Sequence, residues 1–495
     1  MATDKVVSKT SVDYNIGITE PLAERIIQPD DIYIDPVAEA KALKKCDWIL
    51  IPLFSITFMF AFLDRSNIGN AQSAGLETSL NMSAQQYANA VLFFYVTYVP
   101  FEVPGSLLVK KIRPSILLPI WMLGWSITCI GTGFMTTPGQ FYASRLLIGL
   151  FESGMAPGLA ITLTTFYTPA EQGRRFYYLY TSAGLAGAFG GLFAYGILQM
   201  DGIQGLEGWR WLFILEGVIS CFIAAVLWVL MPDNPATAVF LNAADKEVFR
   251  LREQKHAAYT AINERFDKAE IWACFTDPKI YLSGGVQFFG DVISLGSSTF
   301  LPIIIKSFGF ATIETQLLLI PVYTWGTLLY VGISFWSDRV KSRVVFMLPG
   351  AVSCIIGYAL YIGVPSSLRG VLYFSQFFLL PGIYTLLGMN YIWMLNSHAG
   401  YYKRATAVGM NLTMGNAAGL IIGQIYKDKN SAGKYIIGSA VSLGSAGCAI
   451  IMMAFLYFYL RRQNRIRDAL TPEERQQWVD AGKKGDAHPD FRFLL

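Results

Sequence analysis

The sequence Arg145-Leu-Leu-Ile-Gly149-Leu-Phe-Glu152-Ser-Gly-Met-Ala-Pro157 places an arginine and a glutamate inside an apolar segment at about 141–166. Seven residues, or two helical turns, separate the two charges, so they share one helix face about 10.5 Å apart, with Gly149 between them. Ionised side chains at bilayer depth are costly and usually face a cavity or a partner. We therefore expect this face to line a binding site for a small anion. The alternative is that Arg145 lies at headgroup level and Glu152 makes a structural hydrogen bond.

The composition is that of a polytopic membrane protein. Of 495 residues, 53% are hydrophobic and 15% charged, and the mean hydropathy is +0.41. A soluble protein of this size is far more polar. The six cysteines contain no Cys-x-x-Cys pair and the three histidines are scattered, which predicts no metal site and no cofactor. The sequence contains no nucleotide-binding loop or nucleophile arrangement, so we expect neither an enzyme nor a nucleic-acid-binding protein.

Twelve apolar segments are long enough to cross a lipid bilayer, which takes about 20 residues. They predict an all-helical integral membrane fold with six-helix halves at 48–231 and 280–460. We expect a polar linker at 232–279 and cytoplasmic tails at 1–47 and 461–495. The predicted spans are 48–70, 87–109, 115–135, 141–166, 176–199, 209–231, 280–304, 315–336, 344–363, 370–395, 405–426 and 434–460.

The distribution of lysine and arginine over the loops predicts the orientation of the chain. With the N-terminus inside, the inner loops hold basic clusters such as Lys110-Lys111 and Lys403-Arg404, and the outer loops hold fewer basic residues. This bias predicts that both termini are cytoplasmic. The Asn-x-Ser sequence at Asn81 would then be an outer acceptor for N-glycosylation. We expect a multi-pass protein of the plasma membrane that functions as a monomer.

The two halves resemble each other at a fixed offset. Lys110 and Arg339 are 229 residues apart, as are Gly190 and Gly419. These landmarks lie at loops and at small-residue positions on predicted helices. They indicate two parallel six-helix repeats, an architecture in which the substrate binds between the halves near the midplane.

The loop after the second span, from Gly105 to Arg113, resembles the inner-loop motif G-x-x-x-D-R-x-G-R-R of the major facilitator superfamily but lacks its aspartate. The second copy at 334–343 keeps the acidic-basic pair Asp338-Arg339 but has lost the glycine. The resemblance implies a twelve-helix transporter fold. It also implies a gating role for Asp338, Arg339 and Arg113.

A narrower resemblance covers nearly the whole chain and is to the fungal allantoate permease family of anion:cation symporters. It implies proton-coupled import of a small carboxylate, such as allantoate, nicotinate, pantothenate or biotin. The stretches that carry it are Leu63–Ala71, Tyr98–Pro104, Arg145–Pro157, Gly208–Gly217 and Trp393–Arg404.

Resemblance to the proton-coupled sugar-acid carriers of the same symporters implies roles for four residues. Asp64 and Glu152 resemble the protonatable pair, Arg145 the partner of the substrate carboxylate, and Arg65 a supporting partner. The chemistry agrees, because a buried carboxyl group can exchange protons near neutral pH and arginine offers a fork that matches a carboxylate. The alternative is that Asp64-Arg65 is a structural pair at a helix end.

Four further residues are candidates for the binding site. Asn390 and Trp393 of the tenth span are expected to bind substrate, and the alternative is that such side chains bridge helices. Asp291 is the main ionisable residue of the seventh span and is a candidate cavity residue. Glu102, between two prolines of the second span, either contacts the site or has a structural role.

Together these patterns predict a secondary carrier that imports a small organic monoanion with protons. One alternative is an exporter of a small acidic metabolite with the same fold. The other is a nutrient sensor with a carrier fold, which the short tails disfavour.

Overall fold

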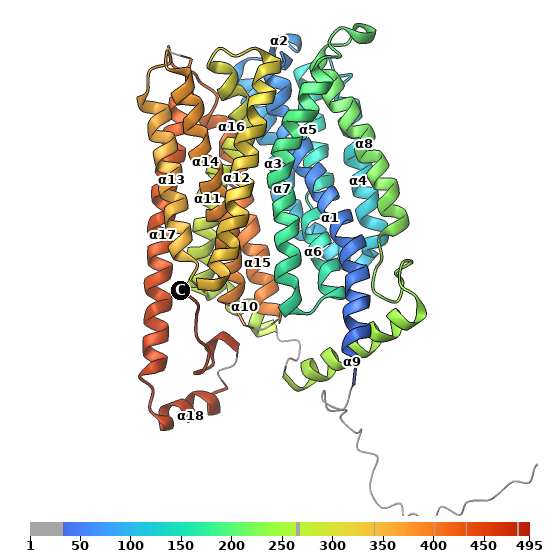
Figure 1. Cartoon of the computed structure of the whole chain (residues 1–495), viewed down its shortest axis with the longest axis vertical. Helices are drawn as coiled ribbons and strands as arrows, with labels where there is room; N and C mark the ends of the chain where they lie inside the picture. The colour runs from blue at the N-terminus through green and yellow to red at the C-terminus, as the bar shows by residue number, and fades with distance from the viewer. Residues whose placement is uncertain (1–32, 264–267, 341, 400, 432, 483–484) are drawn as a thin grey trace, which may run out of the picture.

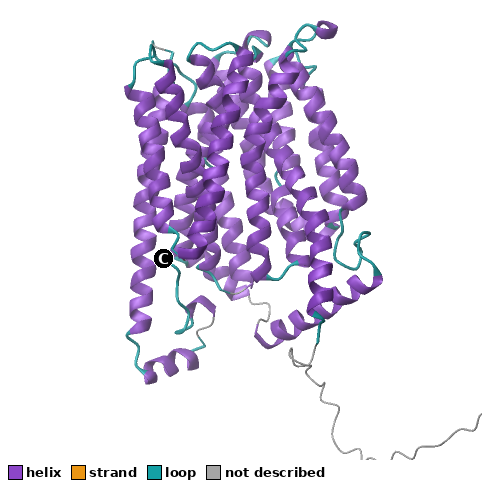
Figure 2. Cartoon of the chain, in the orientation of Figure 1, coloured by secondary structure: helices purple, strands orange, loops and turns teal. Residues whose placement is uncertain are grey.

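The computed structural model describes residues 33–495 except 264–267, 341, 400, 432 and 483–484. Within these residues the chain forms helices and no strand (Figures 1 and 2). This confirms the predicted all-helical class. A short cap, α2 (Leu76–Ser79), marks one end of the molecule, and the helices α9, α10 and α18 mark the other (Figure 1).

The helices form an N-terminal and a C-terminal bundle. The N-terminal bundle contains α1 (Pro36–Ser73), α3 (Ala84–Ile112), α4 (Pro114–Thr132), α5 (Pro138–Glu152), α6 (Met155–Phe166), α7 (Pro169–Leu198) and α8 (Gly208–Leu230). The C-terminal bundle contains α11 (Pro278–Ser307), α12 (Thr312–Val340), α13 (Val344–Gly363), α14 (Arg369–Asn396), α15 (Tyr401–Asn416), α16 (Gly419–Ile425) and α17 (Ile436–Asp468). The segment between the bundles carries α9 (Ala243–Asn263) and α10 (Lys268–Thr276), and α18 (Pro472–Asp480) follows α17.

Nine helical segments of the described chain are long and apolar enough to cross a membrane. The other three predicted spans correspond to α3, α7 and the α15–α16 pair, which pack with the nine. The number twelve therefore stays a prediction. The first helix begins at Pro36 instead of residue 48, because Asp35 caps it by accepting from the Val37 amide (3.1 Å) and proline suits a first helical turn.

Two predicted spans are interrupted at the centre of the molecule. The fourth is split into α5 and α6 after Glu152, and the eleventh into α15 and α16 after Asn416. Irregular backbone at membrane depth is tolerated where protein buries it or where it lines a cavity. Both interruptions therefore direct attention to the region between the bundles.

The bundles contact each other through α1 with α11, α3 with α16, and α7 with α12. Small residues allow this: a Cβ at Gly69 would lie 2.0 Å from the Thr299 carbonyl oxygen, and one at Gly423 would lie 2.3 Å from that of Ala88. Among the described residues, the hydrogen bonds that join the bundles run from the α2 end to mid-depth. The molecule is therefore closed between the bundles at the α2 end.

Candidate functional site

A cavity of about 140 Å³ lies between the two bundles. Its N-terminal wall includes Arg65, Glu102 and Glu152, and its C-terminal wall includes Asp291 and Asn416. The interruptions of the fourth and eleventh spans thus both reach the cavity, since Glu152 and Asn416 are the last residues of α5 and α15. Aromatic side chains complete the lining, namely Phe58, Phe62, Tyr98, Tyr330, Tyr384 and Tyr391.

The N-terminal wall is organised by a buried ion pair between Arg65 of α1 and Glu152 of α5. Arg65 donates from Nε (3.1 Å) and from Nη2 (2.5 Å) to the same oxygen, Oε1 of Glu152. The guanidinium also lies 4.6 Å from the ring centre of Tyr98. The second carboxylate oxygen, Oε2, is buried and has no hydrogen-bond partner among the described residues. The pair therefore leaves one acceptor unsatisfied next to the cavity.

Arg145 lies on the same helix as Glu152 but does not line the cavity. It is buried, its guanidinium lies 5.0 Å from the Phe94 ring centre, and its Nε and Nη1 have no hydrogen-bond partner among the described residues. Gly149 explains the arrangement, because a Cβ there would lie 2.2 Å from the Phe94 carbonyl oxygen, so glycine lets α3 approach. Arg65 also contacts the Phe94 ring, at 5.1 Å. Phe94 thus contacts both arginines, of which only Arg65 reaches the cavity.

Asp64 precedes Arg65 in α1 but belongs to a separate polar cluster that does not line the cavity. Its carboxyl accepts from Trp125 Nε1 (3.0 Å) and Ser220 Oγ (3.2 Å). Asn67, on the same helix as Asp64, donates to the buried carboxyl of Glu216. Two buried carboxyl groups therefore lie outside the cavity lining.

A model of the Major Facilitator Superfamily matches residues 54–423, which is most of the chain. The chain belongs to the Major Facilitator Superfamily. It is 37% identical over 492 residues to an uncharacterized transporter of Schizosaccharomyces pombe, covering 99% of this chain and 95% of the relative. It is 32% identical over 459 residues to the high-affinity nicotinic acid transporter of Saccharomyces cerevisiae, covering 92% and 85%. The protein is therefore a multi-pass membrane transporter of small molecules and not an enzyme.

Solved structures of superfamily proteins share the fold. A bacterial homolog of the human lysosomal transporter Spinster, in an inward-facing and unoccupied conformation, aligns with a TM-score of 0.66 at 14% identity, covering 89% of this chain and all of that one. A D-xylose-proton symporter aligns with a TM-score of 0.64 at 15% identity, covering 83% and 97%. At this identity the likeness shows the fold alone.

The gating residues expected from the superfamily loop motif lie at the end opposite α2. Arg113 is exposed between α3 and α4, with a positive φ of 89°. Arg339 is exposed in the last turn of α12, and the neighbouring Asp338 side chain lies outside what the structure describes. Asn81 is exposed at the α2 end, next to the start of α3. The roles of these residues stay predictions.

The two expected substrate residues of α14 lie behind the cavity wall. Asn390 donates to the Ser283 carbonyl oxygen (3.1 Å) and to Gln287 Oε1 (3.0 Å). Trp393 Nε1 donates to the carbonyl oxygen of Leu494 (2.9 Å), in the C-terminal tail that returns to the bundle. In this conformation both therefore position other groups.

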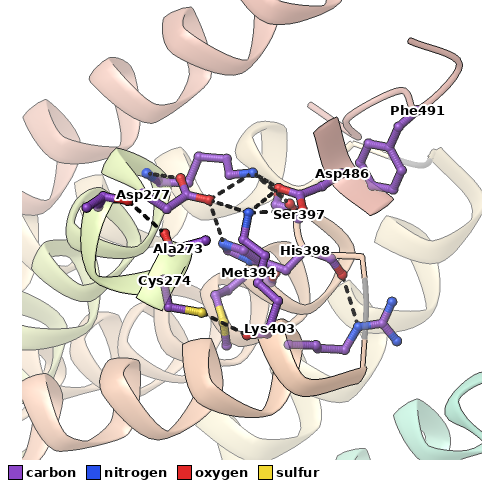
Figure 3. A network of polar contacts seen from close by, with 12 residues as sticks. Ala273, Cys274, Asp277, Met394, Ser397, His398, Lys403, Asp486 and Phe491 are labelled. Atoms are coloured by element: carbon purple, nitrogen blue, oxygen red, sulfur yellow. Dashed lines mark hydrogen bonds and ion pairs between the residues drawn. The ribbon is translucent and has the colours of Figure 1, made fainter. Parts of the chain in front are cut away.

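Lysines and aspartates form a second ionic network in the C-terminal bundle, where the starts of α11 and α15 meet the tail (Figure 3). Lys403 pairs with Asp277 (2.9 Å) and with Asp486 of the tail (2.8 Å), and Lys279 also binds Asp486. Burial raises the pKa of Asp486, but these two ammonium groups outweigh it and hold that pKa below its usual range. Burial, with help from Lys279, lowers the pKa of the adjacent His398 to about 4, so this histidine is neutral near pH 7.

Sequence reasoning missed Gln287 and the tyrosines Tyr330 and Tyr391 as cavity residues. Gln287 had a signal, since it precedes Asp291 by four residues and shares its helix face. The tyrosines had none, because aromatic residues occur throughout the spans and the sequence does not separate lining from packing.

Proposed function

We propose that this transporter imports a small organic carboxylate together with protons. The observation that carries the proposal is the Arg65–Glu152 pair at the cavity wall, in which Glu152 keeps one oxygen without a partner. The chain's similarity to the nicotinic acid transporter of Saccharomyces cerevisiae supports a carboxylate substrate. We also propose that the chain belongs to the anion:cation symporters and, within them, to the allantoate permease family.

Proton coupling follows from the charge balance of this pair. With Glu152 ionised, the pair is neutral and the guanidinium is occupied. An entering carboxylate would leave a buried net negative charge, which is costly in a low-dielectric site. A proton on Glu152 removes that charge, frees the fork of Arg65 for the substrate and leaves the pair with the bound anion neutral. Release of the proton on the far side restores the Arg65–Glu152 pair and expels the anion.

Arg145 and Asp64 have supporting roles in the proposal. Arg145 is a second cation near Glu152, and its two unpaired donors would become available to a carboxylate if Phe94 moved. Asp64, one residue away from Arg65, is buried beside the buried carboxyl-bearing helix α8 and would be a second site for the coupled proton. These residues therefore join Arg65 and Glu152 in one coupled group.

The volume and lining of the cavity favour a ring-sized acid. Its volume, about 140 Å³, is close to that of the engineered cavity of about 150 Å³ that accommodates benzene. Tyr98, Tyr330 and Tyr384 offer aromatic surfaces to such a ring. A nicotinate-like or similarly small vitamin-like acid therefore fits better than a long flexible acid.

The predicted orientation indicates which side of the membrane the closed end of the molecule faces. With both termini cytoplasmic, the α2 end is the outer end, so hydrogen bonds such as Gln85 to Gln424 (2.9 Å) close the outer side. We propose that this is an inward-facing arrangement of a plasma-membrane carrier that functions as a monomer. Arg113, Asp338 and Arg339 would then form the inner gate when the bundles rock.

Uptake by cells that express the chain tests this function. Radiolabelled nicotinate, pantothenate, biotin, allantoate and a sugar acid are offered at pH 5 and pH 7.5. We expect uptake of one acid that is faster at pH 5 and that is lost in Arg65→Gln. Loss of preloaded acid from the cells without uptake would favour an exporter, and neither uptake nor loss would favour a sensor.

A further inference from the structure

The three carboxyl groups that line the cavity differ in their ion-pair and hydrogen-bond partners. Glu152 is paired with Arg65, and Glu102 accepts hydrogen bonds from Asn416 Nδ2 (3.1 Å) and Thr413 Oγ1 (3.4 Å) across the bundle seam. Asp291 accepts one hydrogen bond, from Gln287 Nε2 (3.0 Å) to Oδ2, and has no cation partner among the described residues. The C-terminal wall of the cavity therefore presents an acidic group that forms no ion pair with a described residue.

The cavity lining as a whole also carries more acidic than basic side chains. Among the described lining residues, Arg65 is the one basic side chain, against the carboxyls of Glu102, Glu152 and Asp291. Glu152 already balances Arg65. A carboxyl in such a site needs a proton or a cationic partner. An ordinary monoanion satisfies Arg65 and offers nothing to Asp291.

The position of Asp291 is held by its neighbours. Asn390 donates to Gln287 Oε1 (3.0 Å), which turns the amide nitrogen of Gln287 toward Asp291 Oδ2. On the other side, α15 packs directly against Oδ2, because a Cβ at Gly415 would lie only 2.1 Å from that oxygen. No described donor reaches Oδ1, and Asp291 lines the cavity. This is an acceptor held in place for a group that enters the cavity.

We propose that the substrate carries a nitrogen that shares a proton with Asp291, in addition to the carboxylate that binds Arg65. The inference rests on the proposed function and narrows it to carboxylates with a pyridine, ureido or similar nitrogen. For a pyridine ring the proton lies between the nitrogen and Oδ1, and for a ureido group the N–H donates to Oδ1. In both cases the substrate binds Arg65 of the N-terminal bundle and Asp291 of the C-terminal bundle at the same time.

Binding of matched acids to the purified full chain tests the proposal. Thermal-shift titrations at pH 5.5 would give Kd values for nicotinate and benzoate, which share ring size and carboxylate but differ in the nitrogen. A second pair is 2-oxoimidazolidine-4-carboxylate and cyclopentanecarboxylate. We expect each nitrogen-bearing acid to bind at least about tenfold more tightly, which is the effect of one hydrogen bond to a charged group.

Asp291→Leu should remove this preference, because leucine has a similar shape and cannot hydrogen-bond. Benzoate binding should change less than about twofold, which also shows that the variant is folded, while nicotinate weakens to the level of benzoate. If the leucine variant does not fold, Asp291→Asn is used, and the preference should fall at least about threefold. Ser294→Ala, one turn away on the cavity wall, is the matched control and should keep the wild-type ratio.

The outcomes separate this inference from the proposed function. Equal binding within each pair by the wild type would overturn the inference and leave carboxylate transport intact. A preference that survives both Asp291 variants, with a changed pH dependence for all four acids, would make Asp291 a proton site only. Absence of binding by any of these acids and by the uptake panel would overturn the proposed function itself.

Discussion

The two six-helix bundles keep their charges at different depths. In the N-terminal bundle, charged side chains are buried at and beside the cavity: Asp64, Arg65, Arg145, Glu152 and Glu216. In the C-terminal bundle, Asp291 reaches the cavity, and the main buried ionic network lies at the α9 end: Asp277, Lys279, Lys403 and Asp486 (Figure 3).

This difference indicates that the two groups of charges have different roles, one in transport and one in stability. Charges at membrane depth are costly and are retained where they bind or move ions, so the N-terminal bundle is where anion and proton binding are expected. Charges at the end of a bundle are near water and act mainly on stability. Substitutions in the first group should change transport, whereas substitutions in the second should change stability and leave the pH dependence of transport alone.

The largest expected effect is on the Arg65–Glu152 pair. Arg65→Gln leaves Glu152 buried without its cation, and breaking a buried pair costs about 3–5 kcal/mol, so uptake should fall by more than about 100-fold. Arg145→Gln should reduce uptake less, by about tenfold, because Arg145 does not line the cavity. Initial uptake rates, normalised to the protein at the cell surface, measure both.

The exposed Arg461 is the control for this comparison, and Arg461→Gln should transport normally. A larger loss in Arg145→Gln than in Arg65→Gln would reverse the proposed order of the two arginines.

Glu152→Gln should separate substrate binding from proton coupling. Glutamine keeps the shape of a protonated glutamate and cannot release a proton, so net import should slow while exchange of bound for free substrate continues. The ratio of uptake at pH 5 to uptake at pH 7.5 should fall close to one. An unchanged ratio in this variant would contradict proton coupling through Glu152.

His398 should give the C-terminal bundle a pH-dependent stability. Its folded pKa of about 4 lies below the ordinary value of 6.5, so the unfolded chain takes up a proton first as the pH falls. The native state is therefore fully favoured above pH 6.5 and loses stability as the pH falls toward 4, by about 3 kcal/mol in total.

Thermal unfolding of the purified protein between pH 7.5 and pH 4.5 measures this loss. His398→Gln should flatten that part of the profile and leave the pH 5 to pH 7.5 uptake ratio unchanged. A changed ratio would bring His398 into the coupling group together with its neighbours Asp277, Lys279 and Asp486.

The smallest expected effect concerns the C-terminal tail. Asp486→Asn removes the carboxylate that binds Lys279 and Lys403, and we expect a loss of about 1–3 kcal/mol of stability at pH 7 with normal coupling. Because the folded pKa of Asp486 is depressed, the contribution is present above the ordinary value of 3.8 and disappears in stronger acid.

The matched control is Asp490→Asn on the same tail. Asp490 is exposed and pairs with Arg475 at the surface, so its loss should change stability by less than about 0.5 kcal/mol. Equal effects of the two substitutions would mean that Asp486 does not hold the tail.

Hydropathy and charge were enough to predict an all-helical membrane protein, because crossing a bilayer imposes length and polarity on each segment separately. The same rule marked Arg145 and Glu152 as unusual, since charges inside apolar segments stand out in a single sequence. It could not rank Arg65 above Arg145. That order depends on how closely α3 approaches α5 at Gly149, which seats Phe94 against both arginines.

The contacts between the bundles were also beyond the sequence. Helix periodicity puts Gln287 and Asp291 on one face but does not say which neighbour that face meets. Packing turned that face to the cavity, placed Asn390 behind it and brought the tail back to Trp393. Such contacts join residues about 100 positions or more apart, so they are set by how the helices pack and leave no local pattern to detect.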